Sequence, residues 1–107
     1  MTTLFRAISQ LEKDDYDANG IFKTGRNTLE GKQFFRSRTA VLSFVNNALE
    51  QDYDPPYAYL LIVSVDDEQF DIEENTQDLD GYLAVHVDED HLQYFNNCVS
   101  FVKQEIL

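Results

Sequence analysis

An unbroken run of apolar side chains limits what this chain can fold into. Residues 57–65 read YAYLLIVSV, without alternation between apolar and polar positions. Because successive side chains of a strand point to opposite faces, such a run predicts a strand that is covered on both faces. The run is also much shorter than the roughly 20 residues that a helix needs to cross a bilayer. We therefore expect it at the centre of a sheet, in a chain without a membrane span.

A first stripe at helical spacing precedes this run. It predicts an amphipathic helix that begins near Thr39 and is capped by the hydroxyl of Ser37 or Thr39. Proline lacks an amide proton, so the helix should end before Pro55 and Pro56. Its apolar positions are Val41, Phe44, Val45 and Ala48.

A second stripe closes the chain and predicts a helix that Asp88 or Asp90 starts. Its apolar residues follow steps of three and four, and Lys103 would lie near the negative end of the helix dipole. The stripe consists of Leu92, Phe95, Val99, Val102 and Ile106. We expect this helix to pack against the sheet and to be essential for folding.

Alternating patterns predict two further strands, over Thr3–Ser9 and Tyr82–Val87. Residues 10–19 are polar and acidic, and Asn19-Gly20 is a turn signal before a short extended piece, Ile21-Phe22. Gly25 and Gly31 bracket another loop. Together these elements predict a single α+β domain over residues 1–107, with a small, mostly antiparallel sheet of four or five strands packed against two main helices.

The segment from Asp66 to Asp80 holds eight carboxylates in fifteen residues. Its large apolar residues are Phe70, Ile72 and Leu79. Carboxylates can bind calcium, but no window has the acidic positions, glycine and final glutamate of an EF-hand loop. We therefore predict a solvated acidic loop without a metal site.

Charge is the most unusual property of the composition. Twenty Asp and Glu residues face eight Lys and Arg, which gives a net charge of −12. Residues 39–107 carry fifteen of the carboxylates but only one basic residue, Lys103. Such a surface repels nucleic-acid phosphates, so direct nucleic-acid binding is disfavoured. The first hypothesis is therefore a non-catalytic interaction module whose acidic face, built from Glu50 to Asp90, binds a basic protein partner.

Cysteine and histidine add no chemistry to this prediction. Cys98 has no second cysteine to pair with, and it falls within the predicted helix, away from the amino end that would activate a thiol. His86 and His91 lie five residues apart, which leaves a shared site open, but a metal site needs three or four ligands. We predict no catalytic residue and no metal ligand. Because the first residues show no charged leader and apolar run, we expect a cytoplasmic protein.

The order of several short motifs resembles that of ADP-ribosyltransferase-like domains. The matching segments are Leu4-Phe5-Arg6, Gly20-Ile21-Phe22, Gly31-Lys32-Gln33-Phe34-Phe35 before Ala40, and Tyr82-Leu83-Ala84-Val85. That family has an arginine in its first strand, an aromatic-hydroxyl motif that opens the next helix, and a catalytic glutamate near a late strand, and it binds NAD. The resemblance assigns Arg6 to the arginine and Ser37 to the hydroxyl motif.

The late strand departs from the family pattern. Where the glutamate would be sought the sequence reads Asp80-Gly81-Tyr82, and no glutamate is in register. A glutamate there would stabilise a cationic transition state, so its absence implies an inactive or repurposed relative rather than an active transferase. The second hypothesis is an ADP-ribosyltransferase-like domain in which Arg6 and Ser37 line an NAD pocket beside the basic segment Lys23–Arg38. The alternative for Arg6 is an ion pair with one of the abundant carboxylates. The residues alone identify no cofactor.

Overall fold

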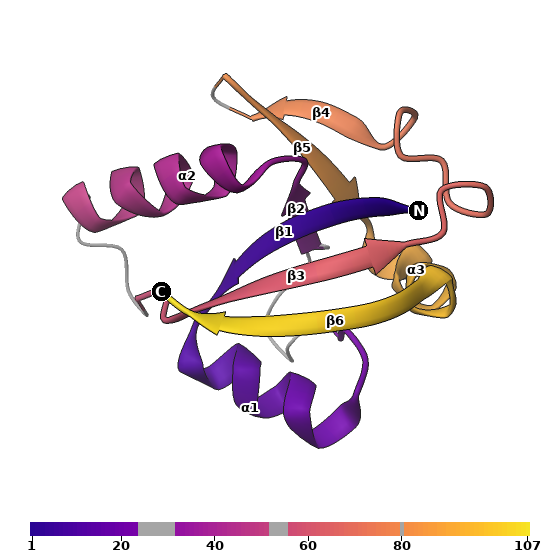
Figure 1. The fold of residues 1–107 in the computed structure, drawn as a ribbon, viewed down its shortest axis with the longest axis horizontal. Helices are drawn as coiled ribbons and strands as arrows, with labels where there is room; N and C mark the ends of the chain where they lie inside the picture. Colours follow the sequence, from indigo (N-terminus) through magenta and orange to yellow (C-terminus); the bar gives the residue numbers. More distant parts are fainter. Residues whose placement is uncertain (24–31, 52–55, 80) are drawn as a thin grey trace.

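The computed structural model describes residues 1–23, 32–51, 56–79 and 81–107, which form one six-stranded sheet and three α-helices (Figure 1). The strand order is β4-β5-β2-β1-β3-β6, and all neighbouring strands are antiparallel. The α+β class is confirmed, but the described residues hold more strands and helices than predicted. In chain order the elements are β1 (Thr2–Ile8), α1 (Gln10–Asn19), β2 (Lys32–Phe35), α2 (Arg38–Glu50), β3 (Tyr59–Val65), β4 (Thr76–Leu79), β5 (Tyr82–Val87), the 3-10 turn η1 (Glu89–His91), α3 (Leu92–Cys98) and β6 (Val99–Ile106).

The apolar run forms β3, an interior strand between β1 and β6. Seven residue pairs join β3 to β1, and seven join it to β6. Leu60 belongs to the core on one face of the sheet, whereas Leu61 and Val63 belong to the core on the other. Both edges and both faces of β3 are thus occupied, which confirms the strand that the sequence predicts.

The sheet separates two groups of buried side chains. The larger group lies under α3 and contains a cluster of four aromatic rings, in which Phe34 and Phe95 are 4.8 Å apart between centroids. Phe22 and Phe70 complete that cluster. The smaller group lies under α2, which contributes Val41 and Val45 (Figure 1). Each face of the sheet therefore has its own helical cover.

α2 and β1 follow their sequence predictions closely. The Ser37 hydroxyl accepts a hydrogen bond from the Ala40 amide at 3.1 Å, so Ser37 caps α2, while β1 runs one residue ahead of the predicted range. α2 ends at Glu50, before the proline pair, of which Pro55 lies outside the described residues. The predicted loop between Gly25 and Gly31 also lies outside them. No helix in the described ranges is long and apolar enough to cross a membrane.

The polar segment before Gly20, for which the sequence predicts no element, is a helix, α1. None of its residues is buried, so it lacks the apolar stripe by which helices are recognised in a sequence. The main-chain groups at both ends of α1 form hydrogen bonds with nearby residues. The Ser9 hydroxyl accepts from the Glu12 amide, and the Gly20 amide donates to the Tyr16 carbonyl at 2.7 Å. Gly20 has a φ of 70°, the left-handed conformation that ends many helices.

The predicted C-terminal helix is wrong beyond Cys98. α3 ends there, and the remaining residues form β6, which pairs with β3 along its length. Leu92 and Phe95 are buried on α3 as the stripe predicts, whereas Ile106 lies at the end of β6 and is 84% exposed. Steps of three and four fitted a helix by coincidence. The strand prevails because it completes the hydrogen bonds along one edge of β3.

The acidic segment after β3 is only partly the loop that the sequence predicts. Phe70 and Ile72 are buried in the larger core, and Thr76–Leu79 form the edge strand β4 against β5. The local sequence TQDL has little strand character, so β4 depends on its pairing with β5. The structure therefore fixes this segment at both ends and in the middle.

Replacing Phe95 with alanine tests the larger core. Phe95 is fully buried among Phe22, Phe34 and Phe70, so Phe95→Ala should lower the free energy of unfolding by about 3 to 5 kcal/mol. The control is Leu11→Ala, because Leu11 on α1 is 72% exposed and its loss should change stability by less than about 0.5 kcal/mol. Urea denaturation followed by circular dichroism measures both. Equal losses would contradict the assigned core.

Candidate functional site

Arg6, the first predicted site residue, is held by a carboxylate. Its Nε and Nη2 atoms donate to the two carboxylate oxygens of Glu12, each at 2.7 Å, and Nη1 donates to the Gln33 carbonyl at 2.8 Å. The guanidinium also stacks over Phe34, with Cζ 5.7 Å from the ring centroid. Its side chain is 17% exposed. All three nitrogens are engaged, so an incoming phosphate would have to displace Glu12.

Lys32 extends this network from the first residue of β2. Its Nζ lies 3.5 Å from Glu12 Oε1. Burial lowers the pKa of Lys32, the nearby charge of Arg6 lowers it further, and the attraction of Glu12 opposes both. Burial would raise the pKa of Glu12, but hydrogen bonds and charge from Arg6 and then Lys32 outweigh it and leave that pKa below its ordinary value. Glu12 is therefore an anion between two cations, partly shielded from water.

Ser37, the second predicted residue, lies at a different place. It lines a cavity of about 370 Å³ at the start of α2, together with Arg36, Thr39, Ala40, Ser43, Gly81, Tyr82 and Leu83. Arg6 lines a separate hollow of about 60 Å³ with Ala7, Gln33, Phe35, Phe44 and Tyr57. The structure therefore does not bring the two predicted site residues into one cavity. The Ser37 cavity is the larger of the two, with four hydroxyl residues and one arginine around it.

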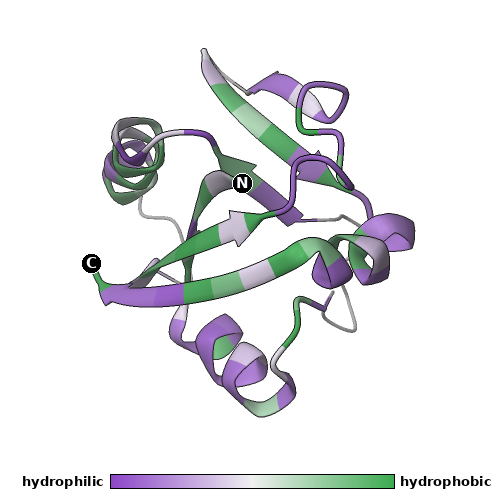
Figure 2. Cartoon of the chain, turned by 45° about the vertical axis from the view of Figure 1, so that its right-hand side comes forward, coloured by the Kyte–Doolittle hydropathy of each residue, from purple (hydrophilic) through white to green (hydrophobic). Residues whose placement is uncertain are grey.

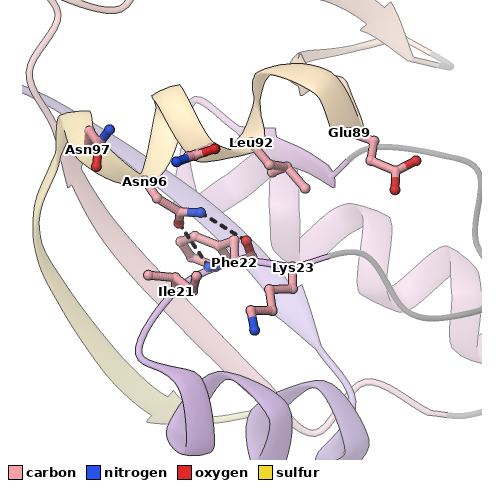
Figure 3. Close-up of a pocket in the computed structure, with 8 residues that line it drawn as sticks. Ile21, Phe22, Lys23, Glu89, Leu92, Asn96 and Asn97 are labelled. Carbon is pink, nitrogen blue, oxygen red and sulfur yellow. Dashed lines mark hydrogen bonds between the residues drawn. The ribbon is translucent and has the colours of Figure 1, made fainter.

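A wider, open cavity of about 510 Å³ lies between α3 and the segment after α1 (Figure 3). Its floor includes Phe22 and Leu92, and Lys23 and Glu89 stand at its rim. The side-chain amide of Asn96 points at the main chain of Phe22: it accepts from the Phe22 amide at 2.8 Å and donates to the Phe22 carbonyl at 2.9 Å. Asn96 is thus committed to holding this segment. No sequence pattern predicted this cavity, because Asn96 belongs to no motif and the resemblance assigns no role to Phe22.

The structure brings both histidines to one carboxylate. His86 Nε2 is 3.0 Å from Asp88 Oδ1, and His91 Nδ1 is 3.8 Å from Asp88 Oδ2. The Nδ1 atom of His86 is buried and has no hydrogen-bond partner in the described part of the chain. Among the residues that the structure describes, no group of three or more histidine, cysteine or acidic side chains is arranged to hold a metal ion. Asp88 is therefore the residue that both histidines contact.

Cys98 is buried at the last position of α3. Burial raises the pKa of its thiol, and the negative charge of Asp66 raises it further. The thiolate is the reactive form, so a raised pKa disfavours nucleophilic chemistry at neutral pH. Cys98 serves as a small apolar residue, as the sequence predicts.

Carboxylates from two separate connections gather at one end of the molecule, which we call the acidic end. It contains residues 66–74 after β3 and residues 88–90 before α3, and Figure 2 colours most of both segments as hydrophilic. The Phe70 ring meets the Phe95 ring at 5.0 Å, and the Tyr94 hydroxyl donates to the Gln69 carbonyl. These contacts fasten the first segment to α3. The acidic residues are Asp66, Asp67, Glu68, Asp71, Glu73, Glu74, Asp88, Glu89 and Asp90.

Few cations reach the acidic end within the described residues. Asp67 pairs with the amino group of Met1 at 3.5 Å, and Glu73 pairs with Arg36 at 2.9 Å. His86 and His91 contact Asp88, and the nine carboxylates outnumber the basic groups that pair with them in the described residues. The acidic face predicted from Glu50 to Asp90 includes both segments, but the sequence does not show that they lie at the same end of the molecule.

A scan against protein-family models, and searches of curated proteins and of solved structures, found no match to this chain. The resemblance to ADP-ribosyltransferase-like domains therefore stays a prediction.

Neutralising Glu12 tests the network around Arg6. Because the pKa of Glu12 is lowered on folding, its contribution to stability is present above its ordinary pKa of 4.5 and is lost as the pH falls through the lower folded value. Glu12→Gln should cost about 1 to 3 kcal/mol at pH 7 and should flatten the loss of stability below pH 4.5.

Asp14→Asn is the matched control, because Asp14 lies on the same helix and is exposed. It should change stability by less than about 0.5 kcal/mol. Urea titrations at a series of pH values measure both variants. A Glu12→Gln protein with the stability and pH profile of the parent would rule out the network as a stabilising feature.

Proposed function

We propose that this chain is a non-catalytic interaction module whose acidic face, built from Glu50 to Asp90, binds a basic protein partner. The observation that supports it is the gathering of nine carboxylates from two connections at the acidic end. Like charges brought together lower the stability of a fold by repulsion. The same concentrated negative field speeds the encounter with a positively charged surface. Lysine and arginine side chains of the partner would meet the carboxylates at the rim.

The aromatic support of the acidic end favours a binding role. Phe70 and Tyr94 fix the acidic connection against α3, so the carboxylates stand on an ordered surface. An ordered surface loses less conformational freedom on binding than a free loop does. The engagement of Arg6 by Glu12 and the burial of Cys98 also favour binding over catalysis.

Salt and charge neutralisation test this proposal. Immobilised protein should recover a basic protein from a cell lysate at about 50 mM salt and lose it at about 500 mM, because salt screens exposed charges. With that protein purified, calorimetry should show that Glu68→Gln combined with Asp90→Asn weakens binding roughly tenfold, since each lost exposed contact is worth up to about 1 kcal/mol.

The matched control combines Asp14→Asn with Asp15→Asn, which changes net charge equally but lies on α1. It should weaken binding far less. The acidic end is not the docking surface if no protein binds at low salt and is released at high salt. The same conclusion follows if both double variants lose the same affinity.

A second candidate function is the NAD-binding role that the resemblance implies. The Ser37 cavity favours it, because Arg36 and the hydroxyls of Ser37, Thr39 and Ser43 surround the start of α2, next to the ring of Tyr82. Amides at the start of a helix and an arginine suit a phosphate, and a tyrosine ring can stack on a base. Arg36 would have to release Glu73 to bind a phosphate, and Arg6 would join such a site only if it left Glu12.

Calorimetric titration with millimolar NAD tests this candidate. Ser37→Asp keeps a side chain that can cap α2 but sets a negative charge against a phosphate, so it should abolish binding. Asn46→Asp is the control, because it adds the same charge at an exposed position further along α2 and should leave binding unchanged. An absence of heat with the parent protein, or equal binding by both variants, would exclude NAD from this cavity.

A further inference from the structure

The outer edge of β6 differs from the other edge of the sheet. β4, the opposite edge, has four residues, one of them the acidic Asp78, whereas β6 has eight residues and no proline. Proteins commonly protect sheet edges from pairing with other chains by short strands, prolines, charged side chains or bulges. β6 carries two charges of opposite sign, Lys103 and Glu105, and a register shift where Val65 pairs with Val99. It is nevertheless twice as long as β4 and has no proline, so it offers a longer open edge.

The ladder with β3 fixes which groups of β6 face outward. The Leu107 amide donates to the Ala58 carbonyl at 3.0 Å, and the neighbouring register pairs Tyr59 with Ile106. In an antiparallel pair, alternate residues direct both main-chain groups to the same neighbour. Odd-numbered residues from 101 to 107 thus bond to β3, while Val102, Gln104 and Ile106 direct their amides and carbonyls away from it. No hydrogen bond to those outward groups is found within the described ranges.

A second copy of β6 can satisfy these groups in one register. If Gln104 faces its own copy across a two-fold axis, Lys103 faces Glu105 of the other chain, twice per dimer. Glu105 also accepts from Arg38 of its own chain at 3.0 Å, so in the dimer it would lie between two cations. That pair falls at the position without hydrogen bonds, where side chains approach most closely. Moving the register by two residues sets Lys103 against Lys103 or Glu105 against Glu105. Charge complementarity therefore selects a single register.

The same register covers the exposed apolar side chains at this end of the chain. It sets Phe101 against Leu107 of the other copy, and Val102 against Ile106. Phe101, Ile106 and Leu107 are 60%, 84% and 42% exposed. Their mutual burial adds a hydrophobic contribution to the hydrogen bonds.

We propose that the outer edge of β6 is the interface of a symmetric homodimer, in which two sheets join through antiparallel β6 strands. Because each chain carries a net charge of −12, long-range repulsion opposes the dimer, and salt should strengthen it by screening that repulsion. This salt dependence is opposite to that of a basic partner at the acidic end. The dimer and the proposed function can therefore fail independently.

Sedimentation equilibrium and hydrogen exchange on the unmodified protein test the proposal. From micromolar to near-millimolar concentrations, we expect a monomer–dimer equilibrium that favours the dimer more at about 500 mM than at about 50 mM sodium chloride. The amides of Val102, Gln104 and Ile106 should gain protection as the concentration rises, whereas those of Lys103 and Glu105 should be protected already. A protein that stays monomeric at both salt concentrations, or outward amides that exchange independently of concentration, would overturn it.

Charge reversal tests the register. Lys103→Glu sets two carboxylates against each other twice per dimer and should weaken association roughly tenfold. The double variant Lys103→Glu with Glu105→Lys restores opposite charges and should recover most of that loss. Both variants are made on an Arg38→Ala parent, because Glu105 otherwise also pairs with Arg38 of its own chain. Lys23→Glu is the control, since it makes the same change in net charge at an exposed residue outside β6. An equal loss with Lys23→Glu, or no recovery in the double variant, would overturn the register.

Discussion

The fold depends on burying both faces of its inner strands. β3 carries buried residues on both sides of the sheet. β1 does the same, with Leu4 on one face and Ala7 on the other. A sheet of this kind is stable only if each face is covered, and a single helix cannot cover two faces. α2 covers one side, while α3 and the anchored Phe22 and Phe70 cover the other. The connections between strands are therefore parts of the core.

Local sequence patterns predicted the elements that carry their own signal. β1, α2, β3 and β5 each have an alternating, continuous or striped apolar pattern, and each is present. α1 was missed because its stability comes from caps at Ser9 and Gly20 and from the bond between Glu12 and Arg6, none of which leaves an apolar stripe. β6 was misassigned because spacing alone could not reveal the open edge of β3 that it completes.

As with the fold, only part of the candidate sites could be predicted from the sequence. Arg6 and Ser37 could be singled out by residue type, and an ion pair for Arg6 was one of the alternatives. Its partner could not be named, because Glu12 reaches Arg6 only after α1 turns the chain back toward β1. The acidic end likewise needed the contact between Phe70 and Phe95, which joins segments far apart in the sequence. The sequence shows which chemical groups are present, whereas tertiary packing determines which groups contact one another.

The clamp between Asn96 and Phe22 has a consequence for how the molecule fluctuates. Two hydrogen bonds join a side chain to a main chain across 74 residues of sequence, as a short strand would. If α3 lifts from the sheet, the Phe22 main chain loses both partners, and its ring leaves the aromatic cluster with Phe95. The segment around Phe22 and helix α3 should therefore open together as one cooperative unit, so that neither opens alone.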